Sequence, residues 1–451
     1  TAAPYGAAFS IFAHMKIQTA LAGVLLLLAS CGKNTPTPRI LDEDILFKCQ
    51  AAIDECIIYD HFPPLQASRN YVYPHIAAYE VLVPFFPEYR SLQGQLNGFP
   101  VLPKQDTAGI NLDAAVTAAF QKTGSALVYS RYLDTFRMKT LAALEAQIGK
   151  KAVERSVAYG ERIADSVLAW AGRDNFRQTR NAPQHNPGNM PASWQPTTPD
   201  FLRGTEPHWG TLRSMLFSAS DFPSLEAPVT YDSTPGSAFM QAAREVLDIQ
   251  KKLDSTQTAI AWYWDDNPIT ITHFGHATIN TFKLSPPGHW MGITRYAVKK
   301  KQLGLMETSE AFTRVSISAF DALIACWKEK YRWDYIRPET VIRRHIEPNY
   351  SPLIQTPPFP EYPSGHATIS ASNGRVLHDL FGDYTFTDST MLQFGISPRT
   401  FNNFVEAADE AAMSRLYGGI HFRNGNEAGK KLGAAVHDLH KNKLVTRTSG
   451  G

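Results

Sequence analysis

Residues 359–381 read FPEYPSGHATISASNGRVLHDLF, a proline-rich approach followed by a segment rich in Ala and Ser. Ser364 is a natural N-cap for a helix over 366–381, and Gly365 allows a backbone N–H to approach a ligand closely. A helix N-terminus with free N–H groups and a hydroxyl binds anions, and His366 adds a proton donor or acceptor beside it. An ordinary capped helix with an incidental histidine is the alternative interpretation.

A second motif lies upstream, where residues 327–338 read WKEKYRWDYIRP. Lys330 and Arg337 are seven positions apart, so on one helix both would project from nearly the same face, two turns apart. Pro338 disfavours helical backbone at the residue before it. Two cations on one face repel each other unless an anion lies between them. A solvated basic helix face is the alternative for this motif taken alone.

The third motif, residues 414–422, reads SRLYGGIHF. A helix that ends at Gly418 and Gly419 would turn the backbone so that Arg415 and His421 converge. A C-capped helix followed by a core histidine is the alternative.

The three motifs together predict one site. They combine three cations, two neutral donors and two histidines: Lys330, Arg337 and Arg415; Ser364 and Gly365; His366 and His421. Cations would balance the charge of a tetrahedral oxyanion, and the neutral donors would bind its oxygens. One histidine would bond the central atom, and the other would transfer protons.

This set resembles the shared signature of type 2 phosphatidic acid phosphatases, bacterial acid phosphatases and vanadium-dependent haloperoxidases. The flanking residues favour the haloperoxidase branch, because Trp327 stands three residues before Lys330 and the run 357–362, PPFPEY, leads into the serine motif. The chain is most similar to the fungal chloroperoxidase type and the bacterial iodoperoxidases. The resemblance implies a vanadate cofactor and a helical architecture over most of the chain.

The resemblance also implies a role for each basic residue. His421 would bond vanadium, or would be the nucleophile that forms a phosphohistidine if the enzyme is a phosphatase. Lys330, Arg337 and Arg415 would neutralise the equatorial oxygens of the bound oxyanion. Lys330 would further polarise hydrogen peroxide.

The remaining motif residues receive roles in the same way. The Ser364 hydroxyl and the Gly365 N–H would donate to the oxyanion. His366 would hydrogen-bond its apical oxygen and act as the acid–base group. Trp327 and Phe359 match positions that line the halide side of the pocket.

The implied activity is oxidation of a halide by hydrogen peroxide to a hypohalous acid equivalent that halogenates an organic acceptor. Iodide is favoured, and bromide is a further substrate. The alternatives are an acid phosphatase that uses a phosphohistidine at the same site, and a non-catalytic lipoprotein that binds an oxyanion.

One position departs from the family pattern. The family often has an aspartate four residues after the metal-bonding histidine, and this chain has Gly425 there. That aspartate supports a histidine in the phosphatases, so its absence weakens the phosphatase interpretation more than vanadate binding. Asp265 or Asp266 is the candidate for a supporting carboxylate.

Helical spacing dominates the rest of the chain and predicts an all-α fold of helical bundles, with the oxyanion or vanadate pocket in the C-terminal bundle. Helices are expected within 112–172, 238–264, 308–336, 400–417 and 426–444. Residues 177–237 are rich in Pro, Gly, Asn, Ser and Thr and predict a long loop packed over the surface through its aromatic residues. We therefore expect an N-terminal helical region over 41–236 and a C-terminal haloperoxidase/phosphatase-type domain over 237–445.

The first 30 residues predict a signal peptide rather than part of the fold. Met15-Lys16 is followed by an apolar run of about nine residues, too short to span a bilayer about 30 Å thick. The run ends in Leu28-Ala29-Ser30-Cys31, which is typical of the lipobox of bacterial lipoproteins. We expect residues 1–14 to precede the start methionine, Cys31 to carry the lipid, and residues 31–40 to form a tether. The enzyme would then be exported and anchored to a bacterial membrane, in the periplasm or on the cell surface.

Composition narrows the function classes further. The chain has 451 residues, of which 43% are hydrophobic, enough for a large core and too many for intrinsic disorder. Lys and Arg number 44 against 42 Asp and Glu, without the basic excess of a nucleic-acid binder. Four cysteines are too few for a disulfide scaffold. We expect Cys49, Cys56 and Cys326 to be small buried core residues.

Overall fold

The computed structural model describes residues 39–218 and 220–448. The described residues cluster as one compact unit. The expected signal peptide, the lipidated Cys31 and most of the tether lie outside the described residues. The expected boundary between residues 236 and 237 falls just before a helix and stays a prediction.

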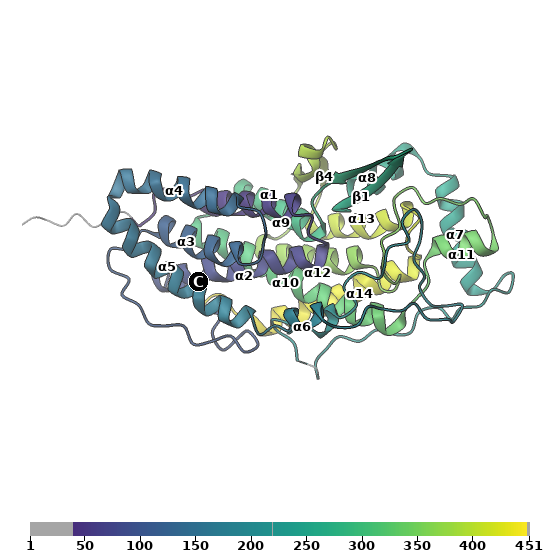
Figure 1. Ribbon diagram of the computed structural model, residues 1–451, viewed down its shortest axis with the longest axis horizontal. Helices are drawn as coiled ribbons and strands as arrows, with labels where there is room; N and C mark the ends of the chain where they lie inside the picture. The colour runs from purple at the N-terminus through teal and green to yellow at the C-terminus, as the bar shows by residue number, and fades with distance from the viewer. Residues whose placement is uncertain (1–38, 219, 449–451) are drawn as a thin grey trace, which may run out of the picture. The chain divides into compact units, whose positions relative to one another are not determined.

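Helices form most of the N-terminal half (Figure 1). They are α1 (Ile45–Tyr59), α2 (Pro64–Leu82), α3 (Leu112–Ser125), α4 (Tyr132–Ile148), α5 (Lys150–Ala171) and α6 (Phe176–Arg180), with 3-10 turns η1 (Val83–Phe85) and η2 (Trp209–Thr211). The helices α3, α4 and α5 fall inside the stretch that helical spacing predicted. Their neighbour α2 contains Pro74 within its length.

The C-terminal half contains the remaining elements. Its helices are α7 (Ala238–Lys251), α8 (Ser255–Tyr263), α9 (Pro286–Lys301), α10 (Leu305–Trp333), α11 (Pro338–His345), α12 (Gly365–Phe381), α13 (Phe404–Tyr417) and α14 (Arg423–Lys443), with the 3-10 turn η3 (Thr390–Phe394). Strands β1 (Ile269–Phe274) and β2 (Ala277–Phe282) pair antiparallel, as do β3 (Phe386–Asp388) and β4 (Arg399–Phe401). The predicted all-α class is confirmed, with these two short hairpins added to it.

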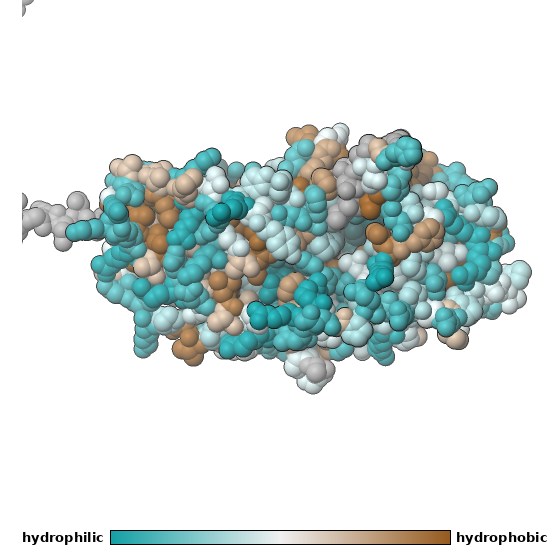
Figure 2. Space-filling model, viewed as in Figure 1, coloured by the Kyte–Doolittle hydropathy of each residue, from teal (hydrophilic) through white to brown (hydrophobic). Residues whose placement is uncertain are grey.

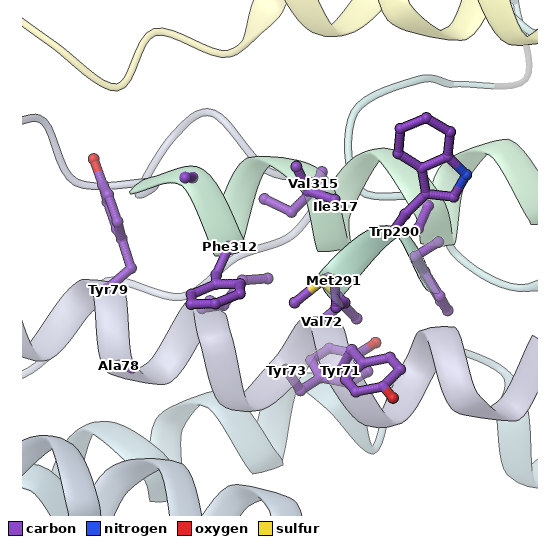
Figure 3. Packing of buried hydrophobic residues seen from close by; sticks show 14 of the residues in the cluster. Tyr71, Val72, Tyr73, Ala78, Tyr79, Trp290, Met291, Phe312, Val315 and Ile317 are labelled. Atoms are coloured by element: carbon purple, nitrogen blue, oxygen red, sulfur yellow. The ribbon is translucent and has the colours of Figure 1, made fainter. Parts of the chain in front are cut away.

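The core lies where α2, α10 and α9 meet (Figure 3). Phe312 of α10 points toward α2, and Met291 of α9 lies between the two helices, while Val315 and Ile317 are buried elsewhere around α10. Burial of these apolar side chains stabilises the fold by roughly 25 cal/mol per Å² removed from water. Because α10 packs on α2 and on α12, the core joins the N-terminal helices to the helix that begins at the serine motif (Figure 1).

Small residues bring α14 close to α12. A Cβ added to Gly433 would lie 2.2 Å from the Thr368 carbonyl oxygen, and one added to Gly429 would lie 2.6 Å from the Ser364 carbonyl oxygen. Any side chain at these positions would push the two helices apart. The glycines of α14 therefore fix the place of the α12 N-terminus.

The backbone between Lys330 and Arg337 differs from the expectation of one continuous helix. Helix α10 ends at Trp333, Asp334 adopts the left-handed region at φ 45°, and Arg337 is an extended N-cap at φ −84° and ψ 150°. Pro338 excludes helical backbone at Arg337 and begins α11 instead. The two cations therefore reach the same place from two helices, and the prediction that they share one helix face was wrong.

The loop over 177–237 packs through its aromatic residues, as predicted. Trp194 and Trp209 are fully buried. The backbone N–H of Trp194 donates to the Asp334 carbonyl at 2.7 Å, and that of Thr205 donates to the Pro358 carbonyl at 2.9 Å. The loop thus covers the turn after α10 and the approach to the serine motif.

The cysteines within the described residues match the sequence expectation. Cys49, Cys56 and Cys326 are free and buried. Figure 2 shows a mostly hydrophilic face in which hydrophobic residues form scattered patches. Within residues 39–218 and 220–448, none of the helices has both the length and the apolar composition needed to cross a lipid bilayer.

Candidate active site

Lys330 lies in the last turn of α10 and is fully buried. Its Nζ donates to the carbonyls of Pro360 at 2.8 Å and Glu361 at 3.0 Å. Burial, reinforced by the charge of Arg337, lowers the pKa of Lys330 to about 7. A lysine held this way becomes fully charged when an anion binds beside it.

Arg337 is also fully buried and stands at the start of α11. Its Nε donates to the Phe359 carbonyl at 2.9 Å, and its Nη1 donates to the Ile420 carbonyl at 2.9 Å. Its buried Nη2 has no hydrogen-bond partner among the described residues. Burial lowers the pKa of this guanidinium to about 10.

Ser364 caps α12, as its sequence position predicted. Its buried Oγ accepts from the Ala367 N–H at 3.4 Å. Gly365 is the first residue of the helix, and a Cβ added to it would lie 3.4 Å from the Trp327 ring. The next residue, His366, has an Nε2 atom without a hydrogen-bond partner in the part of the chain that the structure describes. The helix thus presents its first N–H groups and a free imidazole nitrogen together.

Arg415 reaches the same place from α13. It is 1% exposed, and its Nη1 donates to the Trp264 carbonyl. Its Nε is buried without a partner in the described ranges. Burial lowers the pKa of Arg415 to about 10, while the charges of Asp265 and Asp266 act in the opposite direction.

His421 follows the left-handed turn at Gly419 (φ 78°), between α13 and α14. Its ring is 2% exposed and has both nitrogens occupied: Nδ1 lies 2.8 Å from Oε1 of Glu361, and Nε2 lies 3.0 Å from Nη1 of Arg337. Since a guanidinium can only donate, Nε2 is the acceptor and Nδ1 carries the proton. Nε2 therefore keeps its lone pair on the side of the cations.

The pKa values show that these groups form one electrostatic cluster. The pKa of His421 is far below its ordinary value because of burial first and then the charges of Arg337, Lys330 and Arg415. The pKa of His366 is also far below its ordinary value, again through burial first and then through Arg415. The structure thus brings together all seven residues that the three motifs predicted as one site.

Two aromatic rings border the cations. Nζ of Lys330 lies 5.0 Å from the centre of the Phe359 ring and 5.7 Å from that of Trp327. The rings contact each other with centres 4.8 Å apart, and the Trp327 indole N–H donates to the Thr205 carbonyl at 3.0 Å. Phe359 and Trp327 therefore form an apolar wall on one side of Lys330.

The carboxylate that supports His421 comes from a residue that sequence reasoning missed. Glu361 supplies it, whereas Asp265 pairs with Lys283 at 3.0 Å and Asp266 lies near His366, with Oδ2 3.8 Å from Nε2. The sequence carries a partial signal, an acidic residue just before the serine motif together with a glycine at position 425, but it does not identify which carboxylate supports His421.

A second missed residue is His289 of α9, which is fully buried between two carboxylates. Its Nδ1 lies 2.8 Å from Oδ1 of Asp266, and its Nε2 lies 2.8 Å from Oδ2 of Asp388. The two carboxylates outweigh the opposing effect of burial and raise the pKa of His289 to about 10. A protonated His289 holds Asp266 in the orientation in which it faces His366.

Comparisons with known proteins place this site in a family. Residues 310–449 match the model of the second helical-bundle domain of the vanadium chloroperoxidases. A curated relative, vanadium chloroperoxidase of Curvularia inaequalis, is 24% identical over an alignment of 368 positions. That alignment covers 62% of this chain and 58% of the relative, so the chain spans less than two thirds of that relative's length.

The solved structures extend the likeness over the whole fold. The crystal structure described as the first bacterial vanadium-dependent iodoperoxidase is 36% identical, with a TM-score of 0.84, over 90% of this chain and 97% of that one. The chain belongs to the vanadium-dependent haloperoxidase family. A holo-type bacterial vanadium-dependent chloroperoxidase shares the fold at 17% identity and a TM-score of 0.67, over 89% of this chain and 98% of that one.

The residues of this haloperoxidase fit the vanadate cofactor that family membership implies. Three buried cations surround one place, and two of them keep an unpartnered buried N–H, on Nη2 of Arg337 and Nε of Arg415. Buried donors are nearly always hydrogen-bonded, so these two groups point to an oxyanion as their acceptor. The lone pair of His421 Nε2, which accepts from Nη1 of Arg337 in this structure, would bond the central atom in place of that hydrogen bond.

Proposed function

We propose that this haloperoxidase oxidises iodide with hydrogen peroxide, with bromide as a further substrate, and passes the oxidised halide to an organic acceptor. The observation that carries the proposal is the gathering of the buried cations Lys330, Arg337 and Arg415 around His421, whose Nε2 accepts from Nη1 of Arg337 at 3.0 Å. Such a site binds a tetrahedral oxyanion, and the Nε2 lone pair would bond its central atom once the anion takes over the Arg337 donor.

Bound vanadate supplies a Lewis acid that activates peroxide without changing its own oxidation state. We assign the support of this chemistry to the protein groups already described. Lys330, Arg337 and Arg415 balance the negative charge, and the Ser364 hydroxyl and Gly365 N–H donate to the oxyanion. The free Nε2 of His366 accepts a proton from the incoming peroxide and can return it.

The preference for iodide is supported by the 36% identical relative, whose crystal structure is described as that of an iodoperoxidase. The apolar wall of Trp327 and Phe359 beside Lys330 suits a large, weakly hydrated anion. Iodide loses less hydration free energy than chloride when it leaves water. An apolar wall with one neighbouring cation therefore favours iodide.

A cavity of about 240 Å³ opens onto His366 and Arg415. We assign it as the binding site of the organic acceptor. Pro63, Pro64, Leu202, Ile271, Pro357 and Pro358 give much of its exposed wall an apolar character, and Asp200, Asp265 and Asp266 also line it. Small-molecule sites are typically apolar clefts with a few polar groups at one end. We infer that a small apolar organic molecule occupies this cavity next to the oxidised halide.

The halide assay tests the proposal. Vanadate-free protein is given orthovanadate and peroxide, and triiodide formation is compared with bromination and chlorination of monochlorodimedone. We expect vanadate-dependent iodide oxidation with the highest kcat/KM, weaker bromide oxidation, and loss of both in His421→Ala. The matched control is His378→Ala, which removes an exposed histidine that pairs with Asp383.

Phosphate would fit the same oxyanion site, so the assay includes p-nitrophenyl phosphate. A neutral His421 with a carboxylate behind it is also a suitable nucleophile for a phosphohistidine. Strong hydrolysis without halide oxidation would establish the phosphatase alternative and contradict the proposal. Inactivity in both assays, with retained oxyanion binding, would leave a binding lipoprotein.

We also propose that the protein is exported and lipid-anchored through Cys31, on the basis of the lipobox sequence alone. Mass spectrometry of the mature N-terminus after expression in a bacterial host tests it. A diacylglyceryl cysteine at position 31 is expected, and Cys31→Ser should release the protein from the membrane fraction. An unmodified Cys31 would contradict the anchor.

A further inference from the structure

Glu361 and Gly425 compete for one space behind His421. A Cβ added to Gly425 would lie 2.1 Å from Oε1 of Glu361 and 2.8 Å from its carboxyl carbon. Real Cβ atoms do not approach other atoms this closely, so a side chain at position 425 and the observed Glu361 carboxylate exclude each other. The carboxylate occupies the place that a side chain at 425 would otherwise fill.

From this space the Glu361 carboxylate binds His421. Oε1 of Glu361 accepts from Nδ1 of His421 at 2.8 Å and from the Phe422 N–H at 3.1 Å. Both donors approach the same oxygen, so the carboxylate fixes the ring and the backbone that follows it. Among the ion pairs of residues 39–218 and 220–448, His421 is the partner of this carboxylate.

The backbone of Glu361 binds on the side of the site where Lys330 lies. Its carbonyl accepts from Nζ of Lys330 at 3.0 Å, and its N–H donates to the Tyr335 carbonyl at 2.9 Å. One residue therefore positions both the ammonium of Lys330 and the imidazole of His421. Its side chain is fully buried, so it has no freedom to leave this position without exposing an unpaired charge to the protein interior.

We propose that Glu361 is the positioning residue of His421, and that its carboxylate can occupy this place only because residue 425 is glycine. The inference rests on His421 being the oxyanion ligand of the proposed function. Glu361 accepts the Nδ1 proton and so works with Arg337 to fix the tautomer in which Nε2 is the acceptor, the nitrogen that would bond the central atom of an oxyanion.

Exchange of the two side chains tests the proposal without relying on turnover. Vanadate affinity is measured by isothermal titration calorimetry for Glu361→Ala, Gly425→Asp and the double variant that carries both. We expect about a 10- to 100-fold weaker affinity for Glu361→Ala, as for other residues that orient a metal-binding histidine. Gly425→Asp alone should also bind weakly because its side chain collides with Glu361.

The double variant tests whether a carboxylate at position 425 can replace the one at position 361. With position 361 shortened, the aspartate introduced at position 425 has room for its carboxylate near Nδ1 of His421, so we expect the affinity to return toward the wild-type value. Glu361→Gln keeps an acceptor oxygen and should lie between wild type and Glu361→Ala. Thermal unfolding of each variant shows which ones are folded.

A spectroscopic measurement follows the tautomer itself. Long-range 1H–15N NMR of histidine-labelled, vanadate-free protein identifies the protonated ring nitrogen, with the His421 signals assigned by their loss in His421→Gln. The proton should be on Nδ1 in the wild type. In Glu361→Ala it loses its acceptor, so part of the population should carry it on Nε2, with the ring turned away from its contact with Arg337. An unchanged tautomer together with unchanged vanadate affinity in Glu361→Ala would overturn the inference. Failure of the wild type to bind vanadate would instead refute the proposed function.

Discussion

Nη1 of Arg337 lies 3.0 Å from Nε2 of His421, and the same guanidinium holds the carbonyls of Phe359 and Ile420 through its other contacts. One side chain thus ties together the approach to the serine motif, the turn after α13 and the candidate ligand. A planar guanidinium with several fixed donors suits this task, whereas an ammonium does not reproduce its geometry.

Replacement of Arg337 with Lys should therefore weaken vanadate binding at least tenfold, which is about 1.4 kcal/mol. Calorimetric titration of vanadate-free protein measures the change. Arg343→Lys is the matched control, because Arg343 belongs to the same helix, is half-buried and donates to the Tyr350 carbonyl. Equal affinities of the two variants would contradict the role of Arg337.

His289 should be important for stability. Removal of its charge by His289→Gln leaves Asp266 and Asp388, which bind opposite sides of the ring, buried without their shared counter-charge. Breaking a buried pair of this kind typically costs about 3–5 kcal/mol of unfolding free energy. Urea unfolding at pH 7 measures the loss.

The control for His289 is the exposed pair of His378 and Asp383, 3.0 Å apart. Exposed ion pairs contribute about 0–1 kcal/mol, so His378→Gln should change the unfolding free energy little. Similar losses in the two variants would show that the buried His289 pairs add nothing beyond an exposed one.

A side chain at position 433 should destabilise the protein. Gly433→Ala places a Cβ 2.2 Å from the Thr368 carbonyl and forces α14 away from α12, at an expected cost of about 1–3 kcal/mol. Gly172→Ala is the control, because its added Cβ meets no atom closer than 3.5 Å and its φ of −63° suits alanine. Thermal unfolding compares the two, and a stability loss that is no larger for Gly433→Ala would contradict the close helix packing.

Glu80 provides a test of pH dependence far from the active site. Its buried carboxyl accepts from the Leu92 N–H at 2.6 Å and from the Ser91 hydroxyl at 2.8 Å. Burial raises the pKa of Glu80 from 4.5 to about 7. The folded protein therefore keeps a proton that the unfolded chain releases, and the contribution of Glu80 to stability falls as pH rises from about 4.5 to 7.

The side chain of Glu80→Gln cannot ionise. As pH rises through this range, the unfolding free energy of the variant should therefore increase relative to that of the wild type. The relative gain should reach up to about 3 kcal/mol at pH 7. Urea unfolding at several pH values measures it. Parallel curves for the two proteins would contradict a neutral Glu80 in the folded state.

Most of the fold and the main site residues could be predicted from sequence, because long amphipathic helices and dense motifs carry strong local signals. The hairpin over 269–282 was missed although ITITHFGHATINTF alternates around a glycine, because each strand is only six residues long. The continuous helix through Lys330 and Arg337 was wrong because the left-handed Asp334 leaves no periodicity signal.

Glu361 and His289 could not be assigned from sequence for a different reason. Their roles arise from contacts between distant segments, such as the one between Glu361 and Gly425, sixty-four positions apart in the chain. Helical spacing does not report such contacts. The missing aspartate at position 425 indicated that a carboxylate was needed elsewhere, but only the packing of α14 shows which one.

The central claim is that His421 and the three cations form a vanadate site that oxidises halide. The most direct measurement is a titration of vanadate-free protein with orthovanadate while peroxide-dependent iodide oxidation is followed. We predict that activity rises linearly to a plateau at one vanadate per chain, and that His421→Ala stays inactive at every ratio. Iodide oxidation that is independent of vanadate, or that survives in His421→Ala, would contradict the account.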